Sequence, residues 1–169
     1  DLESVLADIQ LVGKASGAEA ASAQVVKEMR TKVDNVLSKT KNVGNRPKVF
    51  YELDATDPAK PYTPGPGSWH DTFITMAGGV NAAANAKAQW AQLSTEEIVA
   101  QNPDLIILGD ANWGMDAAAV RARPGWAAIN AVKGGAIFPI DDNLLSRPGP
   151  RLADGLLALA RIIHPELFK

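Results

Sequence analysis

The sequence contains no cysteine and only two histidines, which limits the chemistry that it can support. Disulfides, thiolate zinc sites and thiol catalysis are excluded, although this absence does not identify a cellular compartment. Neither His70 nor His164 has the spacing to another ligand that a zinc site requires. No phosphate-binding GxxxxGK motif is present, and the glycines around Pro66 do not complete a dinucleotide-binding fingerprint. The residues themselves therefore carry no strong enzyme signature.

Long apolar runs and an excess of one charge are also absent. No run approaches the roughly 18 apolar residues that a membrane-spanning helix needs. The formal net charge of -2 provides no basic surface, so nucleic acid is not an expected partner. Hydrophobic residues make up 46% and charged residues 21% of the 169, which is ordinary for a globular domain. The length suits one domain, or one lobe with an appendage.

The chain begins without a recognisable signal peptide, because Asp1 leads directly into a helical pattern. An apolar stripe with helical spacing follows, formed by Leu2, Val5, Leu6, Ile9 and Val12. Such a stripe must be buried against another surface, and we expect that surface in a preceding part of a longer protein. The alternative is a mature N-terminus whose helix packs on this same domain.

A second helix is predicted from about residue 18 to 41. Its apolar face contains Val26, Met29, Val33, Val36 and Leu37. About 24 residues would span roughly 36 Å, which exceeds the needs of a compact lobe. This length favours a solvated helix that connects two lobes, and a core helix of one domain is the alternative.

From residue 46 onward, short strands alternate with helices. Strands are predicted at 49–53, 105–108 and 136–140, the last at a sheet edge because of Pro139. Helices are predicted at 68–77, 94–102, 124–134 and 150–163, with Ser68 and Ser94 as N-caps and Asp71 and Glu97 as their capping-box partners. The proline-rich segment 55–67 is predicted to be loop. This alternation indicates an α/β lobe with a mainly parallel sheet.

Candidate binding residues follow the predicted strands, because ligands of open α/β sheets bind beyond the carboxyl ends of the strands. These residues are Asp54, Tyr62 and Trp69 after the first strand, Asp110, Asn112 and Trp113 after the second, and Asp141, Asp142, Asn143 and Arg147 after the third. Trp90 lies in a separate predicted loop before Ser94. Large aromatic side chains on one rim suit a bulky planar or apolar ligand, and packing beneath the loops is the alternative for each tryptophan.

The adjacent Asp141 and Asp142 and the histidine His70 allow two interpretations each, and His164 allows one. Asp141 and Asp142 form a turn and cap or, alternatively, a carboxylate pair or hard-metal site. His70, in the first turn of a helix, either reaches the rim or has no functional role. His164 precedes Pro165 and is expected at a helix C-terminus, in a structural position.

Four segments, in order, resemble one family. Residues 90–109 read WAQLSTEEIVAQNPDLIILG, residues 68–81 contain a helix that ends in AGGxN, residues 123–141 read RPGWAAINAVKGGAIFPID, and residues 147–151 read RPGPR before an amphipathic helix. Together they resemble the C-terminal lobe of ABC-transporter substrate-binding proteins of the vitamin B12 and iron-siderophore class, the class III periplasmic binding proteins. With the long second helix, the resemblance covers essentially the whole chain.

The resemblance implies two α/β lobes that hold a ligand between them. Residues 1–17 would be the last helix of a missing N-terminal lobe, 18–45 the long interdomain helix, and 46–169 a Rossmann-like three-layer lobe. It also implies an extracytoplasmic carrier, in the periplasm or on the cell surface as a lipoprotein, that docks on a transmembrane permease. No cofactor is implied, and the expected cargo is a small metal chelate: an iron-siderophore, cobalamin or haem.

The resemblance also assigns roles to three residues. Glu96 matches the acidic residue that pairs with permease arginines, Trp90 matches a tryptophan that faces a corrin, and Arg147 matches an arginine on the ligand rim. The proline-heavy loop and Trp113 depart from the family pattern, which leaves the ligand open. Two other functions remain: an α/β enzyme that uses Asp110, Asp141 and Arg147, and an interaction lobe without a transported ligand.

Overall fold

The computed structural model describes residues 1–169 and contains a four-stranded parallel sheet. The strands are β1 (Lys48–Glu52), β3 (Val80–Asn81), β5 (Leu105–Leu108) and β6 (Ile137–Pro139), in the order β3-β1-β5-β6. Parallel neighbours need crossover connections, and helices supply them here. The predicted α/β fold with a mainly parallel sheet is confirmed, and β6 lies at the edge, as Pro139 indicated.

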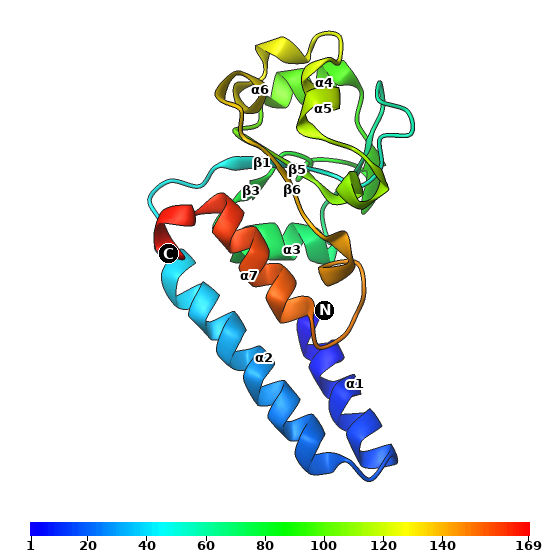
Figure 1. The fold of residues 1–169 in the computed structure, drawn as a ribbon, viewed down its shortest axis with the longest axis vertical. Coiled ribbons are helices and arrows are strands. Elements are labelled where there is room, and N and C mark those ends of the chain that lie inside the picture. Colours follow the sequence, from blue (N-terminus) through cyan, green and yellow to red (C-terminus); the bar gives the residue numbers. More distant parts are fainter.

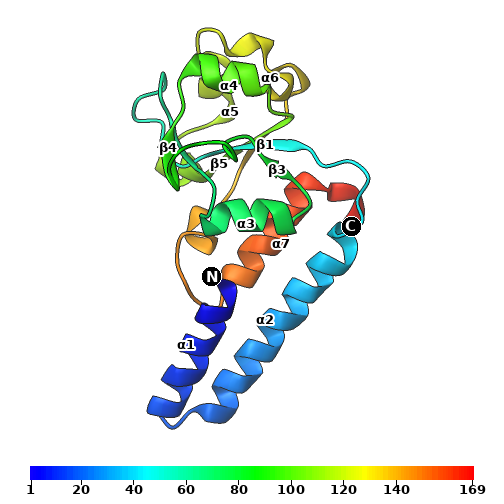
Figure 2. The ribbon, with the colours of Figure 1, turned by 180° about the vertical axis from the view of Figure 1, so that it is seen from behind.

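Helices cover both faces of the sheet and form three layers (Figures 1 and 2). One face carries α3 (Trp69–Met76) and α7 (Leu152–Ile163), and the other carries α4 (Thr95–Gln101), α5 (Ala117–Arg121) and α6 (Asn130–Gly134). Successive strand residues point to opposite faces, so each helical layer packs on its own set of strand side chains. In β1, Tyr51 joins the α3–α7 core while Phe50 joins the α4–α6 core.

Two long helices at the N-terminus extend the α3–α7 layer. The helices α1 (Leu2–Ala15) and α2 (Glu19–Thr40) pack along each other, and their connected ends project away from the sheet (Figures 1 and 2). The part of α2 nearer the sheet packs on α7, and Lys32 Nζ lies 2.5 Å from Asp154 Oδ1. At the projecting end, Leu11 and Val12 are each 65% exposed. None of the helices combines the length and apolar character needed to cross a membrane.

The segment 55–67, predicted to be loop throughout, contains a strand. β2 (Tyr62–Pro64) pairs antiparallel with β4 (Trp90–Gln92), so the prediction that Trp90 lies in a loop is also wrong. Two such short strands show no alternation that a sequence can reveal. Pro64 tolerates this position because, on the side away from β4, β2 is bridged only at Tyr62, which leaves the outer side of Pro64 unpaired.

The predicted helix from 124 to 134 is also wrong in its first half. Gly125 adopts a left-handed φ of +83°, so Pro124 does not start an α-helix, and a 3-10 turn, η2 (Trp126–Ala128), precedes α6. The sequence also did not reveal α5 or the two-residue strand β3. The remaining 3-10 turns are η1 (Gly109–Trp113), η3 (Asp142–Leu144) and η4 (Pro165–Leu167).

Of the two predicted capping boxes, one forms. At α4, the Ser94 side chain accepts from the Glu97 N–H, and the Glu97 carboxylate accepts from the Ser94 N–H at 2.7 Å. At α3, Ser68 caps the helix, but Asp71 does not complete the box. The Asp71 carboxylate instead accepts from the Gly67 N–H at 3.3 Å and from Asn81 Nδ2 at 2.9 Å, because the shorter side chain turns toward β3.

Candidate functional site

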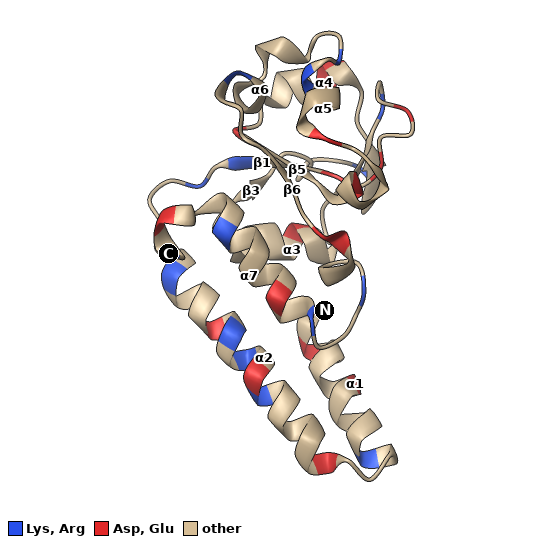
Figure 3. Ribbon diagram, viewed as in Figure 1, with Lys and Arg blue, Asp and Glu red and all other residues tan.

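The segments that follow β1, β5 and β6 are joined by hydrogen bonds at the carboxyl edge of the sheet. Asp110 Oδ2, after β5, accepts from the backbone N–H of Ala55, after β1, at 3.1 Å. Asn112 Nδ2 donates to Asp141 Oδ1, after β6, at 2.8 Å. The predicted polar residues therefore meet at one rim, and acidic segments are visible on this side of the sheet in Figure 3.

Asp142 lies at the centre of one cluster on this rim. Its Oδ1 accepts from the Tyr51 hydroxyl at 2.5 Å and lies 3.3 Å from His70 Nε2, while its Oδ2 accepts from the Ser146 hydroxyl. Burial opposes ionisation of Asp142, but the hydrogen bonds from His70, Ser146 and Tyr51 outweigh it and hold the pKa below the usual aspartate value. Burial and the Asp142 charge together raise the pKa of Tyr51 well above its usual range.

Aromatic rings connect this cluster to the surface. The Tyr51 and His70 rings are centred 5.1 Å apart, and the His70 ring meets the Trp90 ring edge-on at 5.8 Å. His70 is 1% exposed and Trp90 is 49% exposed. His70 therefore does not reach the rim surface; it lies beneath it and supports Trp90.

Arg147 lies four residues beyond Asn143, on the segment that Asp142 anchors. Its Nε donates to Asn143 Oδ1 at 2.8 Å, and the side chain is exposed. The arginine makes no ion pair with Asp141 or Asp142. Asp141 instead accepts from the Asn143 N–H and caps η3, which agrees with its interpretation as a turn former.

A second carboxyl cluster lies beneath the β1 and β5 ends. Glu52 is fully buried, and its two oxygens accept from Arg123 Nη1 at 2.5 Å and Nη2 at 2.8 Å. Asp110 is 4% exposed; its Oδ2 binds the Ala55 N–H, and its Oδ1 has no hydrogen-bond partner. Burial, with a contribution from the Glu52 charge, raises the pKa of Asp110 to about 6.

An open pocket of about 430 Å³ lies above this cluster, and we name it the Asp110 pocket. Its walls come from the loop after β1, from η1 and its end, and from α5, and they consist of Asp54, Ala55, Thr56, Asp110, Trp113, Gly114, Met115 and Ala119. Trp113 is 84% exposed, more than any other large hydrophobic residue of the chain.

The remaining predicted ligand residues lie on other parts of the rim. Trp69 is half-buried and, with Trp90, lines an open hollow of about 270 Å³ beside Asp1 and Leu2. Tyr62 is 44% exposed on β2, where its backbone pairs with Asp54. The five aromatic and arginine candidates therefore border one edge of the lobe without converging on a single pocket of this chain.

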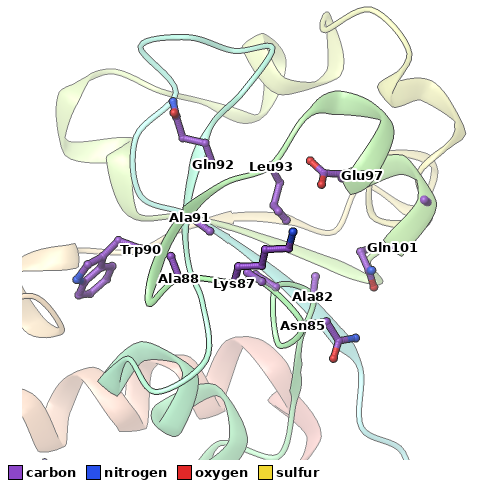
Figure 4. Close-up of a pocket in the computed structure, with 13 residues that line it drawn as sticks. Ala82, Asn85, Lys87, Ala88, Trp90, Ala91, Gln92, Leu93, Glu97 and Gln101 are labelled. Atoms are coloured by element: carbon purple, nitrogen blue, oxygen red, sulfur yellow. The ribbon is translucent and has the colours of Figure 1, made fainter.

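The largest pocket, about 560 Å³, lies between α4 and the segment 82–93 (Figure 4). Alanines line much of it, and Lys87, Glu97 and Gln101 add polar groups. The Trp90 ring points away from the other labelled side chains of this pocket (Figure 4). Glu96 lies in the first turn of α4 and is exposed, and the capping box uses Glu97, so Glu96 has no hydrogen-bond role in that box.

The histidine and acidic residues do not assemble a metal centre: no three of them are grouped closely enough to hold an ion. His164 ends α7, where Nε2 lies 3.2 Å from the Gly78 carbonyl and Nδ1 lies 3.0 Å from Glu166 Oε1. These contacts join the end of α7 to the end of α3, which is a structural arrangement.

Sequence reasoning missed Tyr51, Glu52, Arg123 and Ser146, which build the two carboxyl clusters. Glu52 offered a signal, because a glutamate at the end of an otherwise apolar buried strand requires a partner charge. Nothing local indicates that Arg123, 71 residues away, is that partner.

Comparison with known proteins identifies the family of this chain. A family model described as periplasmic binding protein matches residues 1–144. The chain belongs to the periplasmic binding protein family. This is a family of binding proteins, so the enzyme alternative built on Asp110, Asp141 and Arg147 is set aside.

Individual relatives agree with this assignment. The chain is 34% identical over 165 residues to the uncharacterized ABC transporter substrate-binding lipoprotein YvrC of Bacillus subtilis (strain 168), covering 98% of this chain and 51% of that protein. It is 30% identical to a cobalamin-binding protein of Halobacterium salinarum, covering 96% and 44%. The apo structure of the periplasmic heme-binding protein RhuT from Roseiflexus sp. RS-1 superposes with a TM-score of 0.84 at 25% identity, covering 99% and 64%. The chain spans about half the length of these curated relatives.

Proposed function

We propose that this chain is the C-terminal lobe of an extracytoplasmic substrate-binding protein that delivers a metal chelate to an ABC importer. The family assignment and the names of the relatives, which include a substrate-binding lipoprotein and a cobalamin-binding protein, support this role. Residues 1–17 then belong to the N-terminal lobe, 18–45 form the connecting helix, and 46–169 form the second lobe. The projecting helix pair, with Leu11 and Val12 exposed, is compatible with a covering lobe.

The observation that carries the proposal is the half-exposed Trp90 beside the anchored segment that bears Arg147. Trp90 rests on His70, and His70 contacts Asp142, which fixes the start of that segment. A flat ring and a guanidinium on one rigid rim suit a planar chelate with peripheral acidic or chelating oxygens. Haems and corrinoids supply the planar ring and iron-siderophores supply the chelating oxygens, so we infer that the cargo belongs to one of these three classes.

The identity of the cargo is tested by purifying the full-length protein and measuring what it retains by mass spectrometry and visible absorption. Titration calorimetry with cyanocobalamin, haemin and a ferric hydroxamate then compares the three classes. We expect one of them to bind with a micromolar or lower Kd. Absence of binding to all three, with no retained chelate, contradicts the proposal and favours the interaction-lobe alternative.

The contribution of the rim is tested with Trp90→Ala and Arg147→Ala in the full-length protein. Each should weaken ligand binding by about tenfold, because aromatic packing and a charge-assisted hydrogen bond each contribute on the order of 1–2 kcal/mol. Phe138→Ala is the matched control, because Phe138 is 37% exposed but lies on β6, away from the Trp90 contacts. If Trp90 is instead a packing residue, its replacement lowers the Tm and leaves the Kd unchanged.

We further propose that Glu96 pairs with an arginine of the permease. Its carboxylate is exposed in the first turn of α4 and is not used by the capping box. Glu96→Arg should leave ligand affinity intact and reduce transport in reconstituted vesicles through charge repulsion. Glu19→Arg reverses an exposed glutamate in the first turn of α2 and controls for the loss of a favourable helix-terminus charge. Equal transport by Glu96→Arg and wild type rejects the docking role.

A further inference from the structure

We propose that the Asp110 pocket is a subsite for a protonated amine, with Asp110 as the hydrogen-bond acceptor at its base and Trp113 as the aromatic wall. This inference rests on the proposed function where it assigns the amine to an arm of the transported chelate. The pocket and its acceptor belong to this chain alone, so the subsite can be tested without knowing the chelate.

The first argument is the unused acceptor. Asp110 lines the pocket at 4% exposure, and the Ala55 N–H binds only one of its two oxygens. Its Oδ1 is buried and lacks any donor within the chain. This oxygen has almost no accessible surface in the structure, so binding requires the Asp110 carboxyl to turn toward the pocket. A buried carboxyl oxygen without a donor is costly, so a ligand N–H that then reaches it gains more than it would at an exposed carboxylate.

The second argument is the charge around the pocket. Arg123 is the cation beneath it, and both of its terminal nitrogens are committed to Glu52. Its guanidinium also lies 4.5 Å from the centre of the Trp126 ring and 3.4 Å, through Nη2, from the Met115 sulfur, so its contacts are made within the chain. The Glu52–Arg123 pair sums to zero, while Asp110 and Asp54 add negative charge at the base and the mouth. The pocket therefore attracts a cation.

The third argument is Trp113. At 84% exposure its ring is not part of the core, yet it forms a wall of the same pocket as the two aspartates. An ammonium over an indole face is stabilised by the ring quadrupole, and the stabilisation adds to that from a carboxylate. Met115 and Ala119 complete the lining and provide apolar contact for the alkyl chain that carries the amine.

The test is an NMR titration of the full-length, ¹⁵N-labelled protein with n-butylammonium, and with n-butanol as the uncharged match. The indole N–H signal of Trp113 is assigned by its loss in Trp113→Phe. We expect butylammonium to shift this signal saturably and butanol to leave it in place. Asp110→Asn should raise the Kd for butylammonium by about tenfold or more, since it removes a charge-assisted bond. Glu19→Gln, on the distant helix pair, should leave the Kd unchanged.

Trp113→Ala is a second variant, and it should fold normally because the side chain is exposed. It should also weaken butylammonium binding, which is followed on the backbone signals of residues 109–115. The inference is overturned if wild type shows no saturable shift, if butanol produces the same shift, or if Asp110→Asn binds butylammonium as tightly as wild type. These outcomes do not depend on chelate binding. A protein that binds butylammonium but none of the chelates contradicts the proposed function and leaves this subsite standing. A protein that binds a chelate but not butylammonium supports the proposed function and overturns this subsite.

Discussion

Asp142 and Asp110 are two carboxyl groups that follow neighbouring strands of one sheet, yet their surroundings differ. Asp142 receives hydrogen bonds from Tyr51 and Ser146 and contacts His70, and its pKa lies below the usual value. Asp110 receives one hydrogen bond from the backbone and retains a buried oxygen without a donor, and its pKa is raised to about 6. Asp110 is also the more deeply buried of the two, so the depth of burial and the number of donors together separate them.

This difference gives the two carboxyl groups different roles: Asp142 stabilises the fold, and Asp110 is available to a ligand. A carboxylate whose acceptors are satisfied within the chain stabilises the fold and fixes the segment that bears Arg147. A carboxyl with one buried oxygen that lacks a donor destabilises the fold and leaves that oxygen for a molecule that enters the Asp110 pocket. Stability measurements on the two aspartates should therefore give opposite signs.

The largest effect is expected for Asp142→Ala. Tyr51 and His70 lose their shared acceptor, and two buried donors left without partners cost about 3 kcal/mol of unfolding free energy. Urea denaturation at pH 7 measures this loss. Asp141→Ala is the control: this neighbour is exposed, and its hydrogen bonds from Asn112 and Asn143 involve exposed groups that water can satisfy, so its effect should be smaller. Equal losses of unfolding free energy in both variants would show that the buried cluster around Asp142 contributes no more to stability than the exposed Asp141.

The opposite sign is expected for Asp110→Asn, which should stabilise the protein by about 2 kcal/mol at pH 8. In wild type, the unfolded chain releases this proton near pH 4 and the folded chain near pH 6, so the folded state binds more protons between these values. Stability from this group is therefore present at low pH and is lost as the pH rises through 6. Asp110→Asn lacks this slope.

The pH dependence is checked by urea denaturation from pH 4 to 8. The difference between Asp110→Asn and wild type should grow across this range and level off above pH 6. Asp54→Asn is the matched control: Asp54 is exposed and accepts from the Thr56 N–H, which an asparagine also satisfies. A variant that is less stable than wild type at pH 8 contradicts the account of an uncompensated carboxyl.

The sequence predicted the longer strands and helices that carry the two aspartates better than the short elements and side chains around them. The strand β5 was predicted at its observed bounds, and β1, β6 and the N-terminal helices nearly so, because each is a clear apolar run or a helical stripe between breakers. The strands β2, β3 and β4 and the helix α5 were missed. Each has five residues or fewer and owes its place to pairing or packing with distant segments, which leaves no local pattern.

The candidate site follows the same division. The rule that strands of a parallel sheet end at one rim predicts that Asp110 and Asp142 lie on that rim, and they do. It did not separate their roles, because their surroundings are set by Tyr51, His70 and Arg123, which are distant in the chain and close only after folding. The number of donors around a carboxyl group depends on tertiary contacts and cannot be obtained from the spacing of residues in the sequence.

The smallest effect is expected for Tyr51→Phe, which removes one donor from Asp142 and leaves His70 and Ser146 in place. The phenyl ring keeps the packing of Tyr51, which is fully buried, so the change isolates the hydrogen bond. The loss should be about 1 kcal/mol at pH 7, since the remaining donors still hold the carboxylate. With fewer donors the pKa of Asp142 should rise toward its ordinary value, and ¹³C NMR of the carboxyl group measures it directly. The sign follows from the lowered pKa: the stability that Asp142 contributes is present above its unfolded pKa and is lost as the pH falls through the folded one, so wild type and Tyr51→Phe should converge in acid. Tyr62→Phe, at the other tyrosine, is the control, because that side chain is 44% exposed. If Tyr51→Phe matches wild type in both stability and carboxyl pKa, the Tyr51 donor does not distinguish Asp142 from Asp110, and His70 and Ser146 alone account for the difference.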